Sequence, residues 1–375
     1  MQRAFICGLA GLAMLGMGAA LASAADYKAP RNGYGQPDLS GAWSNATLTP
    51  EVRSPLYGTR RAQTPQEVRL LQGANAAKDA AGRAPHALST EKGGADDPAA
   101  SDNVGAYDRT WIDNGASVMR VAGEPRTSLI TTDDGQPPRP RGQPARVPLP
   151  GAGSPQAGLR AVAEAAKVDI FEGQGSTAAA HFGSYDNPEN RAPGERCIVS
   201  FGRNGGPPMF PNGWYNNNYI FAQSPTAVAI VVEMVHDVRT IQLGAKHRAD
   251  DVRPWFGDSI GWYEGDTLVV ETDHIPQAQA YYGAWKTLKV TERFRRVGKD
   301  RILYRFTVED PSVWDHPWGG EYELHPLKGQ VLEYACHEGN YALPGILSGA
   351  RAQERAAASQ AKGAAGKGAA GGGGR

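Results

Sequence analysis

Four pairs of neighbouring residues join a histidine to a carboxylate near the end of a predicted strand: His236–Asp237, Asp273–His274, Asp315–His316 and His337–Glu338. An imidazole beside a carboxylate suits general acid/base catalysis, and the same side chains bind divalent metal ions. If several of these strand ends meet at one rim of a barrel, they form an acid/base pair or a non-redox metal site. The eight histidines show no His-x-x-x-His or His-x-His spacing. A divalent metal is therefore compatible with the sequence, and no cofactor is firmly implied.

Two of these pairs are the candidate catalytic residues. His236 and His337 would be the bases, and Asp237 and Glu338 would orient them. Each pair also has a simpler interpretation. Asp237 occupies a predicted tight turn, where aspartate bonds to its own backbone, and His337–Glu338 lies between a cysteine and a helix start. The pairs at 273–274 and 315–316 are expected to be exposed loop residues.

Arginine and tryptophan side chains could complete a small-molecule site. Arg196 and Arg239 could bind negative charge, and Trp262 and Trp314 belong to a dense aromatic set that could line a pocket for a flat or apolar molecule. Core packing explains most aromatic residues equally well. Turn or salt-bridge roles are the default for Arg239 and for Asp258, which lies near a predicted hairpin.

The N-terminal segment indicates export to an oxidising compartment. Residues 1–25 have the basic start, apolar run and small-residue end of a secretory signal, and Cys7 would be removed with it. The remaining Cys197 and Cys336 are expected to form a disulfide. The alternative, Cys336 as a nucleophile with His337 as its base, meets the objection that neighbours on a strand point to opposite faces. We expect a periplasmic or secreted protein.

The composition excludes some partners. Lys plus Arg equals Asp plus Glu at 39 each, so no net charge attracts nucleic acid. No later run approaches the roughly 20 apolar residues that a membrane span needs. A small-molecule ligand or substrate is the expected partner.

The fold class expected is mainly β (α+β), because short alternating strands separated by turns follow one another from residue 197 onward. These predict an antiparallel barrel-like or sandwich domain with a few short peripheral helices and a C-terminal helix. One hairpin turns on Glu264-Gly265-Asp266, and the last strand would place Leu332 and Cys336 on its core face. Thr64 and Glu67 form a capping box that starts a short helix, and a second helix is expected at 157–167.

The domain organisation follows from the composition. We expect a signal peptide at 1–25, N-terminal β segments with a short helix at 26–135, and a Pro/Gly/Arg-rich linker or insertion at 136–195. The antiparallel core and C-terminal helix would occupy 196–357. A low-complexity Ala/Gly/Lys tail at 358–375 is expected to be disordered.

Several stretches carry a resemblance: "PDLSGAW", "GERCI", "EMVHDVRTI", "WFGDSIGWYEGDTLVVET", "YRFTVEDPSVW" and "YACHEGNY". With these the chain resembles a group of exported, largely uncharacterised (hypothetical) Gram-negative bacterial proteins. The resemblance implies one shared fold and carries no catalytic set. The Leu-Ser-Gly-x-Trp opening is also similar, more weakly, to lipocalin-like β-barrels.

The sequence thus favours an exported small-molecule-acting protein, a non-redox acid/base enzyme (lyase, isomerase or hydrolase) on an aromatic or apolar substrate. A non-catalytic ligand-binding protein of the periplasm and a structural envelope protein are the alternatives.

Overall fold

The structure, a computed structural model, describes residues 27–83, 113, 115–167, 185–191, 193–200, 202–211 and 217–370. The predicted signal peptide at 1–25 lies outside these residues. Among the described residues, no helix is long and apolar enough to cross a membrane.

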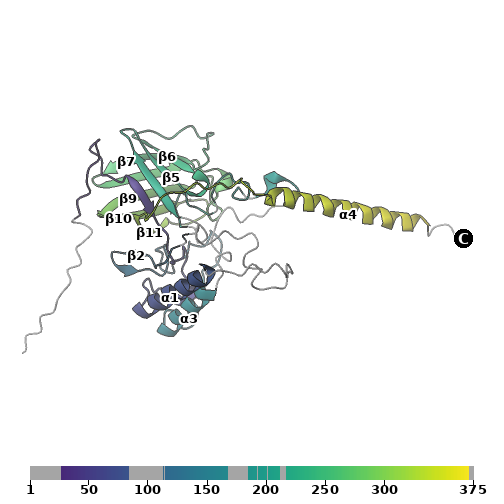
Figure 1. The fold of residues 1–375 in the computed structure, drawn as a ribbon, viewed down its shortest axis with the longest axis horizontal. Helices are drawn as coiled ribbons and strands as arrows, with labels where there is room; N and C mark the ends of the chain where they lie inside the picture. Colours follow the sequence, from purple (N-terminus) through teal and green to yellow (C-terminus); the bar gives the residue numbers. More distant parts are fainter. Residues whose placement is uncertain are drawn as a thin grey trace, which may run out of the picture.

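Nine strands close into a barrel in the order β1, β11, β10, β9, β8, β7, β6, β5, β4 (Figure 1). They are β1 (Gly41–Ser44), β4 (Asn218–Gln223), β5 (Ala227–Val232), β6 (Val238–Leu243), β7 (Asp258–Glu264), β8 (Thr267–Asp273), β9 (Lys289–Gly298), β10 (Arg301–Glu309) and β11 (Trp318–Pro326). The predicted mainly β fold is confirmed, in its barrel form.

One strand pair differs from the all-antiparallel expectation. β6 and β7 run parallel, pairing through Gln242 with Ile260 and Leu243 with Gly261. A parallel pair cannot be joined by a tight turn, so the chain must return along the barrel before β7 begins. Residues 244–257 make this return, and they bring His247 to the start of β7.

Side chains on the barrel strands alternate between the interior and the outer face. On β8, Leu268 and Val270 belong to the hydrophobic core, and Thr272 is also buried. Glu271 and Asp273 therefore lie on the outer face. The interior is filled by aliphatic and aromatic side chains, among them Phe294, whose ring centroid lies 4.9 Å from that of Tyr304.

Helices and short elements lie outside the barrel. α1 (Pro65–Arg83) and α3 (Pro155–Lys167) lie side by side beneath it, and α4 (Ala342–Ala370) projects away (Figure 1). The remaining elements are β2 (Arg120–Val121), β3 (Glu124–Pro125), and 3-10 turns η1 (Pro55–Tyr57), η4 (Pro188–Asn190), η5 (Met234–His236) and η6 (Gln277–Gln279).

The predicted capping box starts α1. The Thr64 backbone N–H donates to Glu67 Oε2 at 2.7 Å, and the Glu67 N–H donates to Thr64 Oγ1 at 3.2 Å. The helix extends to Arg83 and is longer than the short helix expected. Glu67 also pairs with Arg60 at 2.6 Å. The capping residue therefore ties the helix start to the chain before it.

The C-terminal region differs from the expected last strand. Residues 327–341 contain no strand, so Leu332 and Cys336 do not share a sheet face. The predicted disulfide between Cys197 and Cys336 is present, and it fixes this irregular segment to the loop before β4. α4 then includes residues 358–370, which the composition assigns to a disordered tail. Alanine-rich sequence has a high helix propensity, which accounts for this extension.

Candidate metal centre

Two aspartates face each other directly at the open end of the β7–β8 hairpin. Asp258 begins β7, Asp273 ends β8, and the two are cross-strand partners. Cross-strand partners share one face of the sheet, and two like charges placed there repel. The side chain of Asp258 is only 7% exposed, and that of Asp273 is 29% exposed. The hairpin therefore concentrates negative charge where solvent can screen it only in part.

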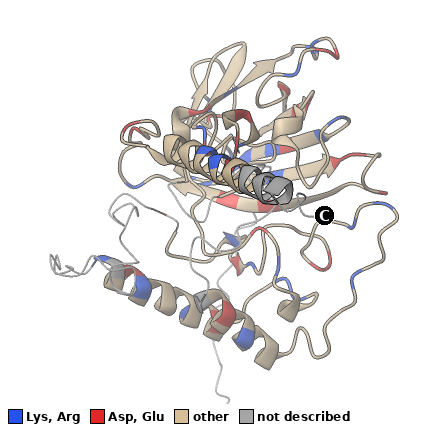
Figure 2. Ribbon diagram, turned by 90° about the vertical axis from the view of Figure 1, so that its right-hand side faces the viewer, with Lys and Arg blue, Asp and Glu red and all other residues tan. Residues whose placement is uncertain are grey.

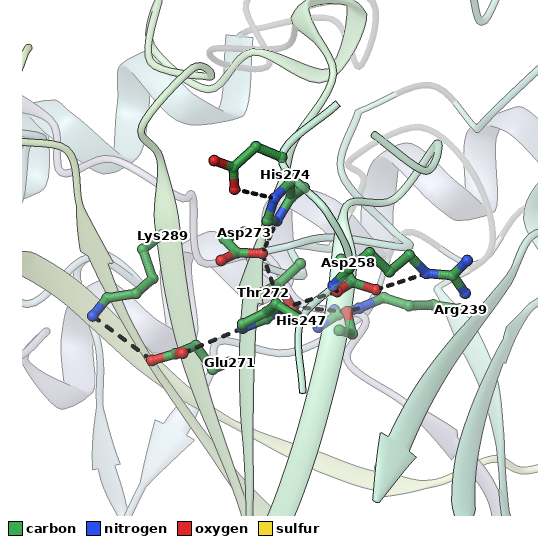
Figure 3. A network of polar contacts seen from close by, with 11 residues as sticks. Arg239, His247, Asp258, Glu271, Thr272, Asp273, His274 and Lys289 are labelled. Atoms are coloured by element: carbon green, nitrogen blue, oxygen red, sulfur yellow. Dashed lines mark hydrogen bonds and ion pairs between the residues drawn. The ribbon is translucent and has the colours of Figure 1, made fainter. Parts of the chain in front are cut away.

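Two histidines close over these aspartates. His247 comes from the 244–257 connection, and its Nδ1 lies 3.0 Å from Asp258 Oδ2 and 3.0 Å from Asp273 Oδ1. His274 follows β8 in the left-handed region, with φ at 50°, and its Nδ1 contacts Asp273 Oδ1. Figure 3 shows both imidazoles directed at Asp273. Each of the four residues offers one ligand atom, and all four atoms lie within 4.8 Å of one another.

The outer nitrogen of each imidazole meets a further carboxylate. His247 Nε2 lies 3.3 Å from Glu271 Oε1, and His274 Nε2 lies 3.3 Å from Asp250 Oδ1. Metal-binding histidines usually have this arrangement, with one nitrogen on the ion and the other hydrogen-bonded to a carboxylate that fixes the ring. It occurs twice here, with both Nδ1 atoms pointing inward. This orientation is a second observation in favour of a metal ion, beyond the clustering of the four ligand atoms.

Arg248 supports the cluster from outside. The Arg248 backbone N–H donates to Asp258 Oδ2 at 2.8 Å, and its Nε donates to Oδ1 at 3.1 Å. Burial acts to raise the pKa of Asp258, but these bonds and the one to His247 outweigh it and lower the pKa. Asp258 is therefore ionised at neutral pH, as a metal ligand must be.

The geometry suits a small divalent ion. Bonds of about 2.0–2.2 Å to nitrogen and oxygen in a tetrahedron place ligand atoms roughly 3.3–3.6 Å apart. The contacts from His247 Nδ1 are close to this, and the farthest pair must approach by about 1 Å. A set of two imidazoles and two carboxylates favours zinc or a similar transition metal, since calcium and magnesium prefer all-oxygen ligands.

The structure separates the residues singled out from sequence. Asp237 is buried and accepts a hydrogen bond from the Ser200 backbone at 3.0 Å, three residues from the disulfide, whereas His236 and His337 are exposed. Among the described residues, no hydrogen bond or ion pair joins the 236–237 pair to His337 or Glu338. These catalytic assignments stay predictions.

The predicted ligand-binding side chains also lie apart. Arg196 is half-buried beside the disulfide, Trp262 is on the outer face of β7, and Trp314 is in the core. Arg239 lies inside the barrel, 2% exposed, with all five of its N–H donors bound by protein acceptors. A ligand finds no free donor on Arg239.

Comparison with protein-family models, curated proteins and solved structures gives no match to this chain. The protein is therefore classified by its fold, a closed mixed β-barrel, and by the four-residue cluster of histidines and aspartates at the β7–β8 end. The sequence did contain the signal for that cluster. Counting residue pairs outward along the two strands from the Glu264-Gly265-Asp266 turn pairs Asp258 with Asp273. His274 follows Asp273 directly in the sequence. Nothing in the local spacing indicates that His247 joins them.

Proposed function

We propose that this protein binds one divalent transition-metal ion, zinc in the first instance, through His247, Asp258, Asp273 and His274. The observation that carries the proposal is the pair of imidazoles whose Nδ1 atoms converge while each Nε2 meets an outer carboxylate. Imidazolium rings held between two carboxylates would make the same contacts, and the hydrogen bond to Asp273 raises the pKa of His274. Zinc titration separates the two arrangements.

For the activity, we propose metal-assisted hydrolysis of a small molecule by an exported protein. Four protein ligands fill a tetrahedron, so a water would have to take a fifth position or replace Asp273, the most exposed ligand. A divalent ion would lower the pKa of a water bound in this way towards about 7, which would supply a nucleophile at neutral pH. Asp273 is the most exposed of the four ligands, and its side gives a substrate access. This belongs to the non-redox acid/base chemistry that the sequence favours, with the reacting groups moved from His236 and His337 to the β7–β8 end.

The test uses purified protein treated with EDTA and reloaded separately with zinc, manganese or magnesium. Each sample is assayed with p-nitrophenyl acetate, p-nitrophenyl phosphate and bis(p-nitrophenyl) phosphate. We expect turnover of at least one ester that requires a transition metal and falls at least a hundredfold in His247→Ala. The matched control is His325→Ala, an exposed histidine outside the cluster, which should keep full activity.

Two results would overturn the proposal in different parts. Turnover that survives EDTA and His247→Ala would remove the metal from the chemistry. Zinc bound at the cluster without turnover of any ester would reject the hydrolase, and the protein would then be a cation-binding protein of the kind that the non-catalytic alternative describes.

A further inference from the structure

A groove of mixed polar and apolar lining crosses β9, β10 and β11. Its volume is about 370 Å³, within the range of small-molecule sites. Its lining includes Thr131, Thr291 and Thr307, of which Thr131 already donates its hydroxyl to the Gly319 carbonyl at 3.2 Å. Gly319 and Gly320 let β11 lie close to its neighbours, because a Cβ at either position would overlap the carbonyl oxygen of Phe306 or Leu129. Pro317 and Trp318 form an apolar end. The groove thus combines two further threonines, Thr291 and Thr307, with the apolar residues Pro317 and Trp318.

The groove and the metal cluster occupy the same outer face. Glu271, which contacts His247, is the cross-strand partner of Thr291, which lines the groove. Thr291 in turn pairs with Thr307, and Thr307 pairs with Gly319. Neighbouring strands lie about 4.8 Å apart, so the groove runs from roughly 5 to 15 Å beyond β8. A molecule of a few rings could reach both places.

Two guanidinium groups line the groove side by side. Arg293 on β9 and Arg305 on β10 are direct cross-strand partners, and both are exposed. Arg293 pairs with Glu264 at 2.7 Å, and Arg305 pairs with Glu321 at 2.8 Å. The Arg293–Glu264 pair is exposed on both sides, and such pairs contribute only about 0–1 kcal/mol. Glu321 is 15% exposed and also binds Arg126, so the Arg305 pair is held more firmly. An anion on the ligand can therefore compete most readily for Arg293, and it would also relieve the repulsion between the two like charges.

The charge distribution makes this pair distinctive. Along the ribbon in Figure 2, Lys and Arg residues alternate with Asp and Glu residues over the barrel and the helical region beneath it. Arg293 and Arg305 thus act locally, at short range, and a compact anion suits them better than a polyanion. The apolar end at Trp318 suits a ligand with a hydrophobic body.

We infer that this groove binds a small organic oxyanion, a carboxylate or phosphate ester with an apolar body, and presents it to the metal centre. The inference rests on the proposed function for the role of the bound molecule as substrate. The binding itself rests on the groove, because none of its lining residues is a metal ligand.

The experiment is a calorimetric titration of the zinc-loaded and the EDTA-treated protein with phenyl phosphate, benzoate and the uncharged benzyl alcohol. We expect saturable binding of phenyl phosphate or benzoate, and the tighter of the two gives the ligand class. Arg293→Gln and Arg305→Gln should each weaken this binding at least tenfold. The matched control is Arg295→Gln, which removes an arginine from the same face of β9 but outside the groove, and it should bind as the wild type does.

Three results would contradict binding in the groove. Absence of binding of both anions, equal binding of benzyl alcohol, or an equal loss in Arg295→Gln would overturn the groove site. Parallel zinc titrations separate the two proposals. Zinc binding without anion binding rejects the groove alone, and anion binding in a protein that takes no zinc rejects the metal centre alone.

Discussion

The two faces of the β7–β8 hairpin end hold polar clusters of opposite character, only one residue apart along each strand. Inside the barrel, Ser259 and Thr272 bind Arg239, whose guanidinium also contacts Glu292. Tyr304 completes the set by donating to Glu292 at 2.7 Å. Outside, Asp258 and Asp273 face each other beneath two histidines. The interior cluster balances its charges with one cation and one anion, whereas the outer cluster leaves two carboxylates opposed.

This difference follows from the strand pleat, which turns successive side chains to opposite faces. A buried charge must be paired and fully hydrogen-bonded, so the interior cluster is complete in itself and stabilises one arrangement of the barrel. The outer cluster keeps ligand-type atoms directed at a common point. We therefore assign structure to the inner face and chemistry to the outer face.

The largest expected loss of stability comes from breaking the Arg239–Glu292 ion pair inside the barrel. Glu292→Gln leaves the buried Arg239 without its counter-ion, which typically costs about 3–5 kcal/mol of unfolding free energy. Urea unfolding followed by circular dichroism measures this loss. At low urea the folded variant should still bind one zinc ion, because Glu292 touches no ligand. A loss below about 1 kcal/mol would show that the inner pair does not hold the barrel.

Asp237 provides a contrast to Glu292, because it is a buried carboxylate that is hydrogen-bonded to Ser200 and, among the described residues, not paired with an arginine. Desolvation raises its pKa to about 6, against the smaller lowering by its Ser200 hydrogen bonds and by His236. Because the folded-state pKa lies above the unfolded value, the contribution of Asp237 to stability is complete below about pH 4 and is lost as the pH rises through 6. The difference of about two units corresponds to about 3 kcal/mol.

The matched measurement uses Asp237→Asn, which keeps an acceptor for the Ser200 N–H but cannot ionise. Urea unfolding free energies are compared at pH 4 and pH 7.5. We expect the wild type to lose about 3 kcal/mol more than the variant between these values. Parallel pH dependences would show that Asp237 is ionised in the folded protein as readily as in the unfolded chain.

The smallest stability effect is expected at the outer cluster. In metal-free protein at pH 8, Asp273→Asn removes one of two opposed charges, so the unfolding free energy should stay the same or rise by about 0.2–1 kcal/mol. Zinc affinity should nevertheless fall at least tenfold, since a carboxylate ligand is lost. Destabilisation of the metal-free variant by 2 kcal/mol or more would mean that Asp273 is a structural ion-pair partner of the histidines.

The sequence predicts the barrel better than the site. Alternating apolar residues, the Glu264-Gly265-Asp266 turn and the Thr64–Glu67 capping box are local patterns, and each corresponds to an element of the structure. The disulfide follows from counting the two cysteines outside the predicted signal peptide.

The metal cluster depends on non-local geometry. His247 reaches Asp258 only because β6 and β7 are parallel and the connection returns over the strand ends. No spacing of residues in the sequence encodes that return. The sequence also predicts a last strand at 332–336 that the structure does not contain. Alternating apolar residues alone do not form a strand when no neighbouring strand is there to pair with.

The central claim is tested most directly by calorimetric titration of zinc into EDTA-treated wild type, His247→Ala and His236→Ala. The account predicts one ion per chain in the wild type and in His236→Ala, with binding abolished in His247→Ala. Absence of zinc binding in the wild type, or binding that His247→Ala leaves unchanged, would contradict it.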